Sequence, residues 1–448
     1  MKIAFLIKDI ILKRKINDPT LSGYLVKGTF GTLIIQGLTV LLTFLSNFLA
    51  ARLLGPAEYG TFTYLFTCIS VFANIAVLGF NSLFIREAAI YKSKSEWTRL
   101  KGLITITSLA VIVVSVILII LGLLLFQKFD FLSKIGDVSL FRVSLIALPF
   151  VSLTLLYQSV LQGLQKVIAG QLAEKIIRPF VFIFLITAIY FFDRSTISIT
   201  IFIWLNVISF GIALAFVTAS VYKNVTPLFK TVKASYENKK WLKSTLYFFV
   251  SSIIQIINSR IDVLLLGIWK GSRDVGIYNV ALRLSDFTTL SLFIVNLVIA
   301  PAISNLYHTR QKEKLQILVT SGARIAFLLS LPVILFLMIG GKFILSLFGE
   351  EFISGYTPMV VIIAAQIINV ACGSVGYILM MTRNEKYSFI ALLMSFLLNI
   401  GLNILLTPYY GMNGTAVAVA VSIVTINGIM LFFVRKKTKI YPTAFGNF

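Results

Sequence analysis

Residues 102–126 read GLITITSLAVIVVSVILIILGLLLF, and no side chain in this stretch is charged. A helix needs about 20 mostly apolar residues to cross the hydrocarbon core of a bilayer. Lipid offers the backbone no hydrogen bonds, so a helical segment that crosses it has to satisfy its own polar groups. The stretch therefore predicts a transmembrane helix.

The rest of the chain repeats this pattern. Hydrophobic residues make up 58% of the sequence and charged residues 13%, whereas a soluble domain has roughly 25% charged residues. We therefore predict an all-α integral membrane protein with 12 transmembrane helices. The predicted spans are 28–50, 60–80, 102–126, 141–162, 168–192, 199–222, 245–268, 276–300, 320–341, 355–380, 387–407 and 414–434.

The distribution of charge orients these spans. Of the 40 Lys and Arg residues, 27 fall on the side of the N-terminus and seven on the opposite side, which is the positive-inside asymmetry of membrane proteins. Both termini are therefore predicted to be cytoplasmic. The predicted cytoplasmic parts are an amphipathic N-terminal segment (1–27), a basic linker (223–244) and a tail (435–448).

Two parts of the chain resemble each other weakly. Because each part holds six spans, an even number, both enter the membrane from the same side. The prediction is two six-helix lobes, 28–222 and 245–434, related by a pseudo-twofold axis along the membrane normal. The matching positions are Leu54-Gly55 and Gly60 with Leu266-Gly267 and Gly276, and Tyr157, Lys166 and Thr187 with Tyr377, Lys386 and Thr407.

Charged residues inside the predicted spans are the candidate site. An ionised group at mid-bilayer costs at least about 2.5–3.5 kcal/mol, so such residues usually face a cavity or one another. Basic residues there suit an anionic cargo, since guanidinium groups bind phosphate in pairs of hydrogen bonds. Acidic residues there are candidates for ion coupling. The basic residues are Arg178, Arg260, Arg283, Lys175, Arg142 and Arg324, and the acidic ones are Asp262, Asp286 and Glu174.

Mutual pairing is the alternative for most of these charges. Glu174 and Arg178 are four residues apart on one helix face and can neutralise each other. Arg283 and Asp286 are three apart, and Arg260 with Asp262 lies at a similar depth on the neighbouring span. Arg142 and Arg324 are close enough to the interface to extend their charges into it. Both interpretations remain open at this level.

Neutral polar residues inside the spans form a further group. Their amides can line a sugar-binding cavity, although such residues more often hydrogen-bond neighbouring helices. They are Asn47, Asn74, Gln158, Gln255, Asn258, Asn296, Gln366 and Asn369.

Several functions are disfavoured by the composition. Two cysteines in apolar stretches and one histidine cannot assemble a zinc site or a histidine-based triad. No GxxxxGK[ST] motif is present, which argues against direct use of ATP. A basic excess can indicate nucleic acid binding, but that requires a soluble basic face. We therefore predict no metal, no cofactor and no nucleic-acid partner.

Five segments, in this order, resemble the Wzx-type flippases of the polysaccharide export family, which is related to the MATE exporters and the MurJ-type flippases. The resemblance implies a V-shaped pair of lobes around a cationic cavity in a bacterial inner membrane. It also implies a cargo, undecaprenyl-diphosphate-linked oligosaccharide repeat units, carried from the cytoplasmic to the periplasmic leaflet. The segments are ARLLGPAEYGTFTY (51–64), LGFNSLFIREAA (78–89), RIDVLLLGIWKGSRDVGIYNVALRL (260–284), FGEEFISGY (348–356) and NIGLNILLTPYYGMNGTAVAVAVS (399–422).

The same resemblance carries expectations about the pathway. The cargo would serve O-antigen, capsule or exopolysaccharide synthesis, with a polysaccharide polymerase and a chain-length regulator as partners besides the membrane lipids. Because the sequence has no ATP-binding motif, an outward flippase would draw on a proton or sodium gradient or on consumption of its product.

Three alternatives remain open. A MATE-type antiporter of small molecules would share the fold, but an acidic cavity suits organic cations better than the basic excess found here. A lipid II flippase is closer, although such proteins usually carry two further helices. An enzyme of the same pathways would need a large outward loop with catalytic groups. The longest such loop, near 127–140, holds no such cluster, so we predict a transporter and not an enzyme.

Overall fold

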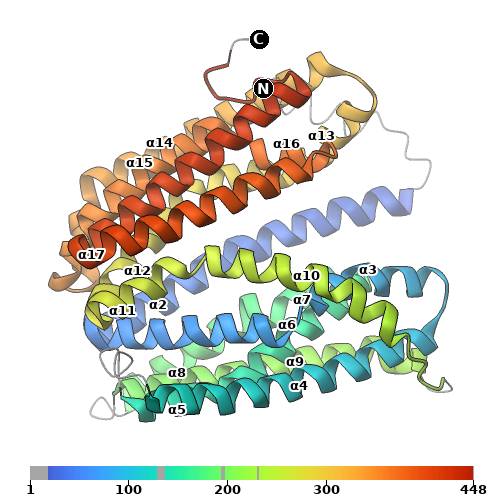
Figure 1. Cartoon of the computed structure of the whole chain (residues 1–448), viewed down its shortest axis with the longest axis horizontal. Helices are drawn as coiled ribbons and strands as arrows, with labels where there is room; N and C mark the ends of the chain where they lie inside the picture. The colour runs from blue at the N-terminus through green and yellow to red at the C-terminus, as the bar shows by residue number, and fades with distance from the viewer. Residues whose placement is uncertain (1–18, 129–136, 193–196, 230–231, 447–448) are drawn as a thin grey trace. The chain divides into compact units, whose positions relative to one another are not determined.

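The computed structural model describes residues 19–128, 137–192, 197–229 and 232–446. Within these ranges every regular element is a helix and no strand is present (Figure 1), which confirms the all-helical membrane fold class. The predicted amphipathic segment before Pro19 lies outside the described residues. The chain divides into two compact units, Gly31–Gly276 and Ile277–Phe448, and the chain before Gly31 is grouped with the second.

The first unit is built around α6, which contacts α3, α4 and α9. Its helices are α2 (Pro19–Ala76), which enters the unit at Gly31, α3 (Phe80–Ser93), α4 (Trp97–Lys128), α5 (Val138–Leu145), α6 (Ala147–Gly163), α7 (Val167–Leu172), the π-helical turn η2 (Ala173–Ile177), α8 (Arg178–Phe192), α9 (Ile199–Phe229), α10 (Asn238–Asn258) and α11 (Ile261–Lys270).

The second unit pairs α13 with α14, and packs the long α17 along α15 and α16. Its elements are α12 (Ser272–Asp286), which begins in the first unit, η4 (Phe287–Thr289), α13 (Leu290–His308), α14 (Lys312–Phe348), η5 (Glu350–Gly355), α15 (Tyr356–Cys372), α16 (Val375–Met381) and α17 (Glu385–Thr438).

Among the described residues, fewer helices are long enough to cross a membrane than the twelve predicted spans, because two long helices each cover two of those spans. Nine helices in the described ranges are long and apolar enough to cross a membrane, and the pair α10–α11, bent by 49°, makes a tenth candidate. Two of the nine, α2 and α17, each cover two predicted spans. Each contains a glycine with non-helical dihedral angles, Gly55 in α2 and Gly411 in α17. The count of twelve stays a prediction.

The internal repeat is visible as two matching corners in the first unit. Gly55 has φ 73° and ψ 174°, and Gly271, between α11 and α12, has φ 85° and ψ −175°. A positive φ of this kind is a conformation that glycine adopts without steric cost. The structure thus matches Gly55 with Gly271, and not with Gly267 as the sequence pattern had suggested.

The two corners also contact each other reciprocally. A Cβ placed on Gly60 would lie 1.7 Å from the carbonyl oxygen of Ser272. A Cβ placed on Gly276 would lie 2.1 Å from the carbonyl oxygen of Pro56. The sequence offset that joins Gly55 to Gly271 also joins Gly60 to Gly276 and Pro56 to Ser272, so each corner places its glycine against the carbonyl of the other. The missing side chains let the backbones of α2 and α12 touch.

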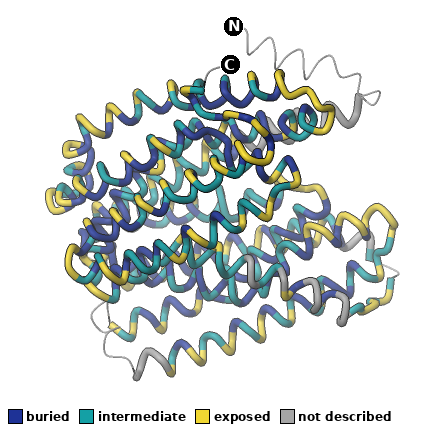
Figure 2. Tube along the Cα trace, turned by 45° about the horizontal axis from the view of Figure 1, so that its top comes forward, coloured by how far each residue is buried: buried dark blue, intermediate teal, exposed yellow. Residues whose placement is uncertain are grey.

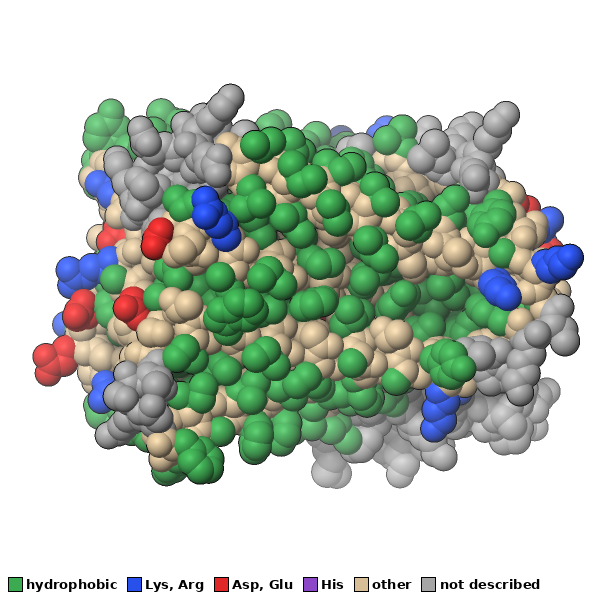
Figure 3. Space-filling model, turned by 90° about the horizontal axis from the view of Figure 1, so that it is seen from below, with side chains coloured by type: hydrophobic (Ala, Val, Ile, Leu, Met, Phe, Trp, Pro, Cys, Tyr) green, Lys and Arg blue, Asp and Glu red, His purple; other side chains and the backbone are tan. Residues whose placement is uncertain are grey.

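The outer surface of the helices suits lipid. Buried and exposed positions alternate along most of the helices (Figure 2). The exposed positions include many large apolar side chains, such as Phe184, Phe336 and Ile339. On the face drawn in Figure 3, hydrophobic side chains fill the middle, and Lys, Arg, Asp and Glu lie near the two ends. This distribution matches a hydrocarbon layer between two polar interfaces.

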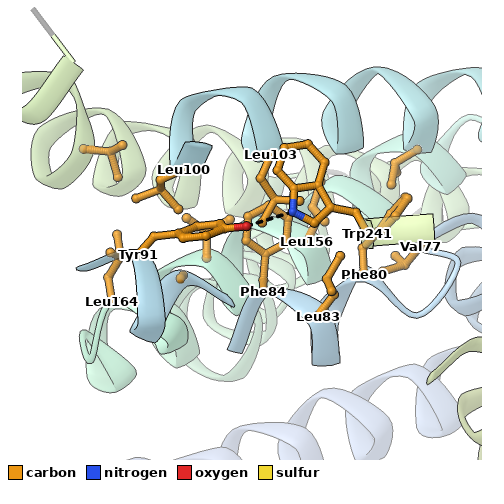
Figure 4. Packing of buried hydrophobic residues seen from close by; sticks show 14 residues of the cluster. Val77, Phe80, Leu83, Phe84, Tyr91, Leu100, Leu103, Leu156, Leu164 and Trp241 are labelled. Carbon is orange, nitrogen blue, oxygen red and sulfur yellow. Dashed lines mark hydrogen bonds between the residues drawn. The ribbon is translucent and has the colours of Figure 1, made fainter. Parts of the chain in front are cut away.

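The end of the predicted basic linker is packed into the first unit. Trp241 is 3% exposed and belongs to a core with Phe84, Leu103 and Leu156 (Figure 4). Its indole Nε1 donates to the Tyr91 hydroxyl at 2.9 Å. The start of α10 is therefore fixed on α3, α4 and α6.

Polar contacts extend this attachment along the linker. Arg99 Nε lies 3.0 Å from Glu237 Oε1, and the backbone N–H of Ser235 donates to the Thr98 carbonyl. Lys101 Nζ donates to the Val232 carbonyl at 2.9 Å.

Candidate functional site

The first cluster of charged residues in the candidate site lies at a π-helical turn within a predicted span. The sequence Ala173–Ile177 forms the π-helical turn η2, between α7 and α8, and it carries Glu174 and Lys175. Pro179 follows at the second position of α8 and has no N–H to bond the carbonyl four residues earlier. That missing bond accounts for the wider turn. Single π-helical turns inside spans are often found at functional sites.

Neutral side chains of other helices contact Lys175 and Arg178. Lys175 Nζ donates to Gln36 Oε1 of α2 at 3.1 Å. The guanidinium of Arg178 lies 4.8 Å from the ring centre of Phe210 on α9. The ring centre of Phe210 lies 6.1 Å from the ring centre of Phe66 on α2. Sequence reasoning missed Gln36 and Phe210, because their partners come from spans far away in the chain.

Arg260 and Asp262 mark the bend between α10 and α11. Arg260 is the N-cap residue of α11, and Asp262 lies in the first turn and is 5% exposed. An acid in the first turn is favoured by the partial positive charge of the helix N-terminus. Both residues belong to the same unit as Lys175 and Arg178.

Arg283 and Asp286 belong to the second unit. Both lie in the last turn of α12, directly before the 3₁₀ turn η4. Asp286 is exposed, and its carbonyl accepts a hydrogen bond from the Thr289 hydroxyl at 2.9 Å. The predicted charges therefore fall into two groups, one in each unit.

Arg142 and Arg324 have different surroundings. Arg142 is exposed on α5 and lines a cavity of about 420 Å³ with the aliphatic side chains Ile119 and Leu123. Arg324 on α14 binds backbone: its Nε donates to the Ala444 carbonyl at 3.0 Å and its Nη2 to the Gly446 carbonyl at 2.9 Å. Arg324 therefore holds the C-terminal segment, residues 439–446 after α17, against α14.

The C-terminal segment is held along one face of α14. Gln316 exchanges two hydrogen bonds with the backbone of Tyr441, at 2.7 and 2.8 Å. The Ala444 N–H donates to the Ala371 carbonyl at the end of α15. The carbonyl oxygen of Pro442 would lie 2.7 Å from a Cβ on Gly373, so the segment packs directly on the break after α15.

A pocket of about 300 Å³ is lined by residues of the second unit, next to that break. Its wall brings together Asn296, Gln366 and Asn369, three of the neutral residues singled out in the sequence. Asn369 Nδ2 donates to Gln366 Oε1 at 2.8 Å. Sequence reasoning missed the remaining polar members, although an asparagine in an apolar span is a usable signal. They are Ser374, Tyr377 and Asn427.

These features define a class of protein, a polytopic helical membrane protein. The fold is similar to that of a multidrug resistance transporter of the MATE family and MOP superfamily in an inward-facing conformation, with a TM-score of 0.73 at 16% identity, over 90% of this chain and 94% of that one. It is also similar to the lipid II flippase MurJ in an inward closed conformation, with a TM-score of 0.68 at 15% identity, over 91% of this chain and 87% of that one.

The sequence places the chain more narrowly. Residues 25–307 match the polysaccharide biosynthesis protein family, and the chain belongs to it. Residues 248–405 also match the MatE family. A probable low-salt glycan biosynthesis flippase of Haloferax volcanii is 25% identical over 197 residues, which is 44% of this chain and 40% of that protein. The chain thus spans well under half the length of this curated relative.

Proposed function

We propose that the chain is a flippase for lipid-diphosphate-linked oligosaccharide, with the basic residues inside its spans binding the diphosphate. Family membership and the probable glycan flippase among its relatives support this assignment. The observation that carries it is Lys175, a cation on the π-helical turn of a span whose hydrogen-bond acceptor is the neutral amide of Gln36. A phosphate oxygen is a stronger acceptor for an ammonium group than an amide oxygen is.

The finer expectations form part of the same proposal. The cargo is an undecaprenyl-diphosphate-linked repeat unit moved outward across a bacterial inner membrane, with both termini cytoplasmic. The charge asymmetry of the loops supports this orientation. Asp262, Asp286 and Glu174 are proposed to couple transport to a proton or sodium gradient, since intramembrane acids are the usual cation sites of transporters.

The test is transport of a lipid-linked oligosaccharide in proteoliposomes. Lys175→Gln should lower the rate about tenfold or more, because a charge-assisted hydrogen bond contributes roughly 1.5–3 kcal/mol. Lys175→Arg should keep part of the rate. Lys166→Gln is the matched control, since this lysine is exposed at the start of the same span. Equal rates for both glutamine variants would contradict the proposed role of Lys175.

A MATE-type antiporter is the second candidate. The match of residues 248–405 to the MatE family favours it. The same proteoliposomes distinguish the two functions: an antiporter would exchange ethidium for protons or sodium, and it would leave the lipid-linked oligosaccharide in its original leaflet.

A further inference from the structure

The pocket lined by Asn296, Gln366 and Asn369, called the amide pocket below, holds buried polar atoms that none of the described residues hydrogen-bonds. Asn296 is 8% exposed and Ser374 is 1% exposed. Neither the Asn296 Oδ1 nor the Ser374 Oγ has a hydrogen-bond partner among the described residues. A buried polar atom without a partner costs about 1–3 kcal/mol. Such a cost is tolerated where a ligand supplies the missing hydrogen bonds.

The backbone at the pocket is also interrupted. α15 ends at Cys372, Gly373 has φ 71° and ψ −149°, and α16 begins at Val375. Non-helical backbone at membrane depth is tolerated where it is buried in protein or lines a polar cavity. Broken helices of this kind form the substrate and ion sites of many transporters.

The charge of the pocket restricts the ligand. None of the described lining residues carries a charged side chain. A diphosphate would find no Lys or Arg there, and a hard cation would find amide oxygens but no carboxylate. Asn and Gln amides offer one acceptor and two donors each, which matches groups that both donate and accept, such as hydroxyls.

The remaining wall restricts its shape. Leu292 of α13 and Ile423 and Ile426 of α17 line the pocket beside the Tyr377 ring. A ligand in it therefore meets amides on some sides and apolar side chains on others. A sugar ring has this character, with hydroxyls at its edge and C–H groups on its faces. A volume of about 300 Å³ is at the lower end for small-molecule pockets, which suits one ring and not a whole oligosaccharide.

We propose that this pocket binds one uncharged sugar ring of the glycan, and that Asn296 and Ser374 determine its specificity. The inference rests on the proposed function for the source of the sugar. The proposed sugar site lies in the second unit, and it is distinct from the basic residues Lys175 and Arg178 of the first unit. Sugar binding to it can be measured without a transport assay.

The experiment uses the full chain in detergent and saturation-transfer difference NMR with glucose, galactose and N-acetylglucosamine as probes. At least one sugar should give a signal with the native protein. Asn296→Leu should lower its affinity about tenfold or more, and Ser374→Ala about two- to tenfold, the range of one neutral hydrogen bond. Asn224→Leu is the control, since its amide bonds the Ser220 carbonyl of its own helix in the other unit.

Thermal stability separates binding from folding. The Asn296 Oδ1 accepts no hydrogen bond from the described residues, so Asn296→Leu should unfold at the same temperature as the native chain or above it. Loss of binding with undiminished stability supports a ligand site. The proposal is overturned if Asn296→Leu loses binding together with stability while Ser374→Ala binds the sugar normally.

Other outcomes also decide the question. No signal from any of the three sugars, a signal that Asn296→Leu leaves unchanged, or stabilisation by sodium chloride alone would overturn the proposal. Transport assays run in parallel separate it from the proposed function. Sugar binding that depends on Asn296 in a chain that moves no lipid-linked oligosaccharide would refute the flippase and leave the pocket standing.

Discussion

Replacing Gly60 by alanine should force α2 and α12 apart. The added Cβ would lie 1.7 Å from the Ser272 carbonyl oxygen and 2.8 Å from the Gly276 nitrogen. Both are backbone atoms, so no side-chain rotation relieves the overlap. Since such contacts are not tolerated below 3.0 Å, one backbone has to move by about 1.3 Å.

The expected cost follows from this displacement. Overpacking a close contact costs about 1–3 kcal/mol, and the better helix propensity of alanine returns about 0.5–1 kcal/mol. Gly276→Ala should act in the same direction, because its Cβ would lie 2.1 Å from the Pro56 carbonyl oxygen. One separation of the helices relieves both overlaps, so the double variant should lose less stability than the sum of the single losses.

The assay is thermal unfolding in detergent with a maleimide dye that fluoresces on reaction with Cys68 and Cys372, the two free cysteines. Gly60→Ala should unfold at a temperature roughly 1–3 °C lower than the native chain. Gly37→Ala is the matched control in α2, since its added Cβ would meet no described atom within 4 Å apart from the backbone of its own helix. Equal melting temperatures for the two variants would refute the close contact of the corners.

Two further predictions use the same thermal assay. Trp241→Phe removes the donor to the Tyr91 hydroxyl and should cost about 1–3 kcal/mol. Trp204→Phe at a 43% exposed position should change stability by less than about 0.5 kcal/mol, and a loss as large as that of Trp241→Phe would contradict the difference in burial. Arg324→Gln removes both hydrogen bonds to the carbonyls of the C-terminal segment and should cost about 1–3 kcal/mol; it should also speed proteolysis after Lys439, and an unchanged cleavage rate would argue against this attachment.

Fold class was predictable because it depends on composition. A stretch such as 102–126 has one physical solution in lipid, and the structure forms α4 there. The helix breaks were less accessible. Gly55 and Gly271 adopt similar dihedral angles, yet the sequence pattern favoured Gly267 as the partner. Glycines occur in spans for several reasons, so their spacing alone does not locate a corner.

The candidate site was predictable in its residue types and not in its groupings. Burial of charge is costly, so Lys175 and Arg178 could be singled out from one sequence. Their contacts with Gln36 and Phe210 depend on which spans are neighbours, and periodicity within a helix carries no information on that. Arg324 illustrates the same limit, because its partners are backbone carbonyls of a segment that has no charge pattern.

The attachment of Trp241 and Glu237 to the first unit has a practical consequence for dividing the chain. A cut within the basic linker would separate the indole from its core and expose a face shaped to receive it. A cut at Gly271 would leave that core intact and fall between two helices. Co-expressed fragments should therefore reassemble better when the first ends after α11 than when it ends after α9. If a chain broken at Gly271 folds and a chain broken within the basic linker does not, the boundary between the folding units lies near Gly271. That boundary then differs from the linker, which separates the two halves of the predicted sequence repeat.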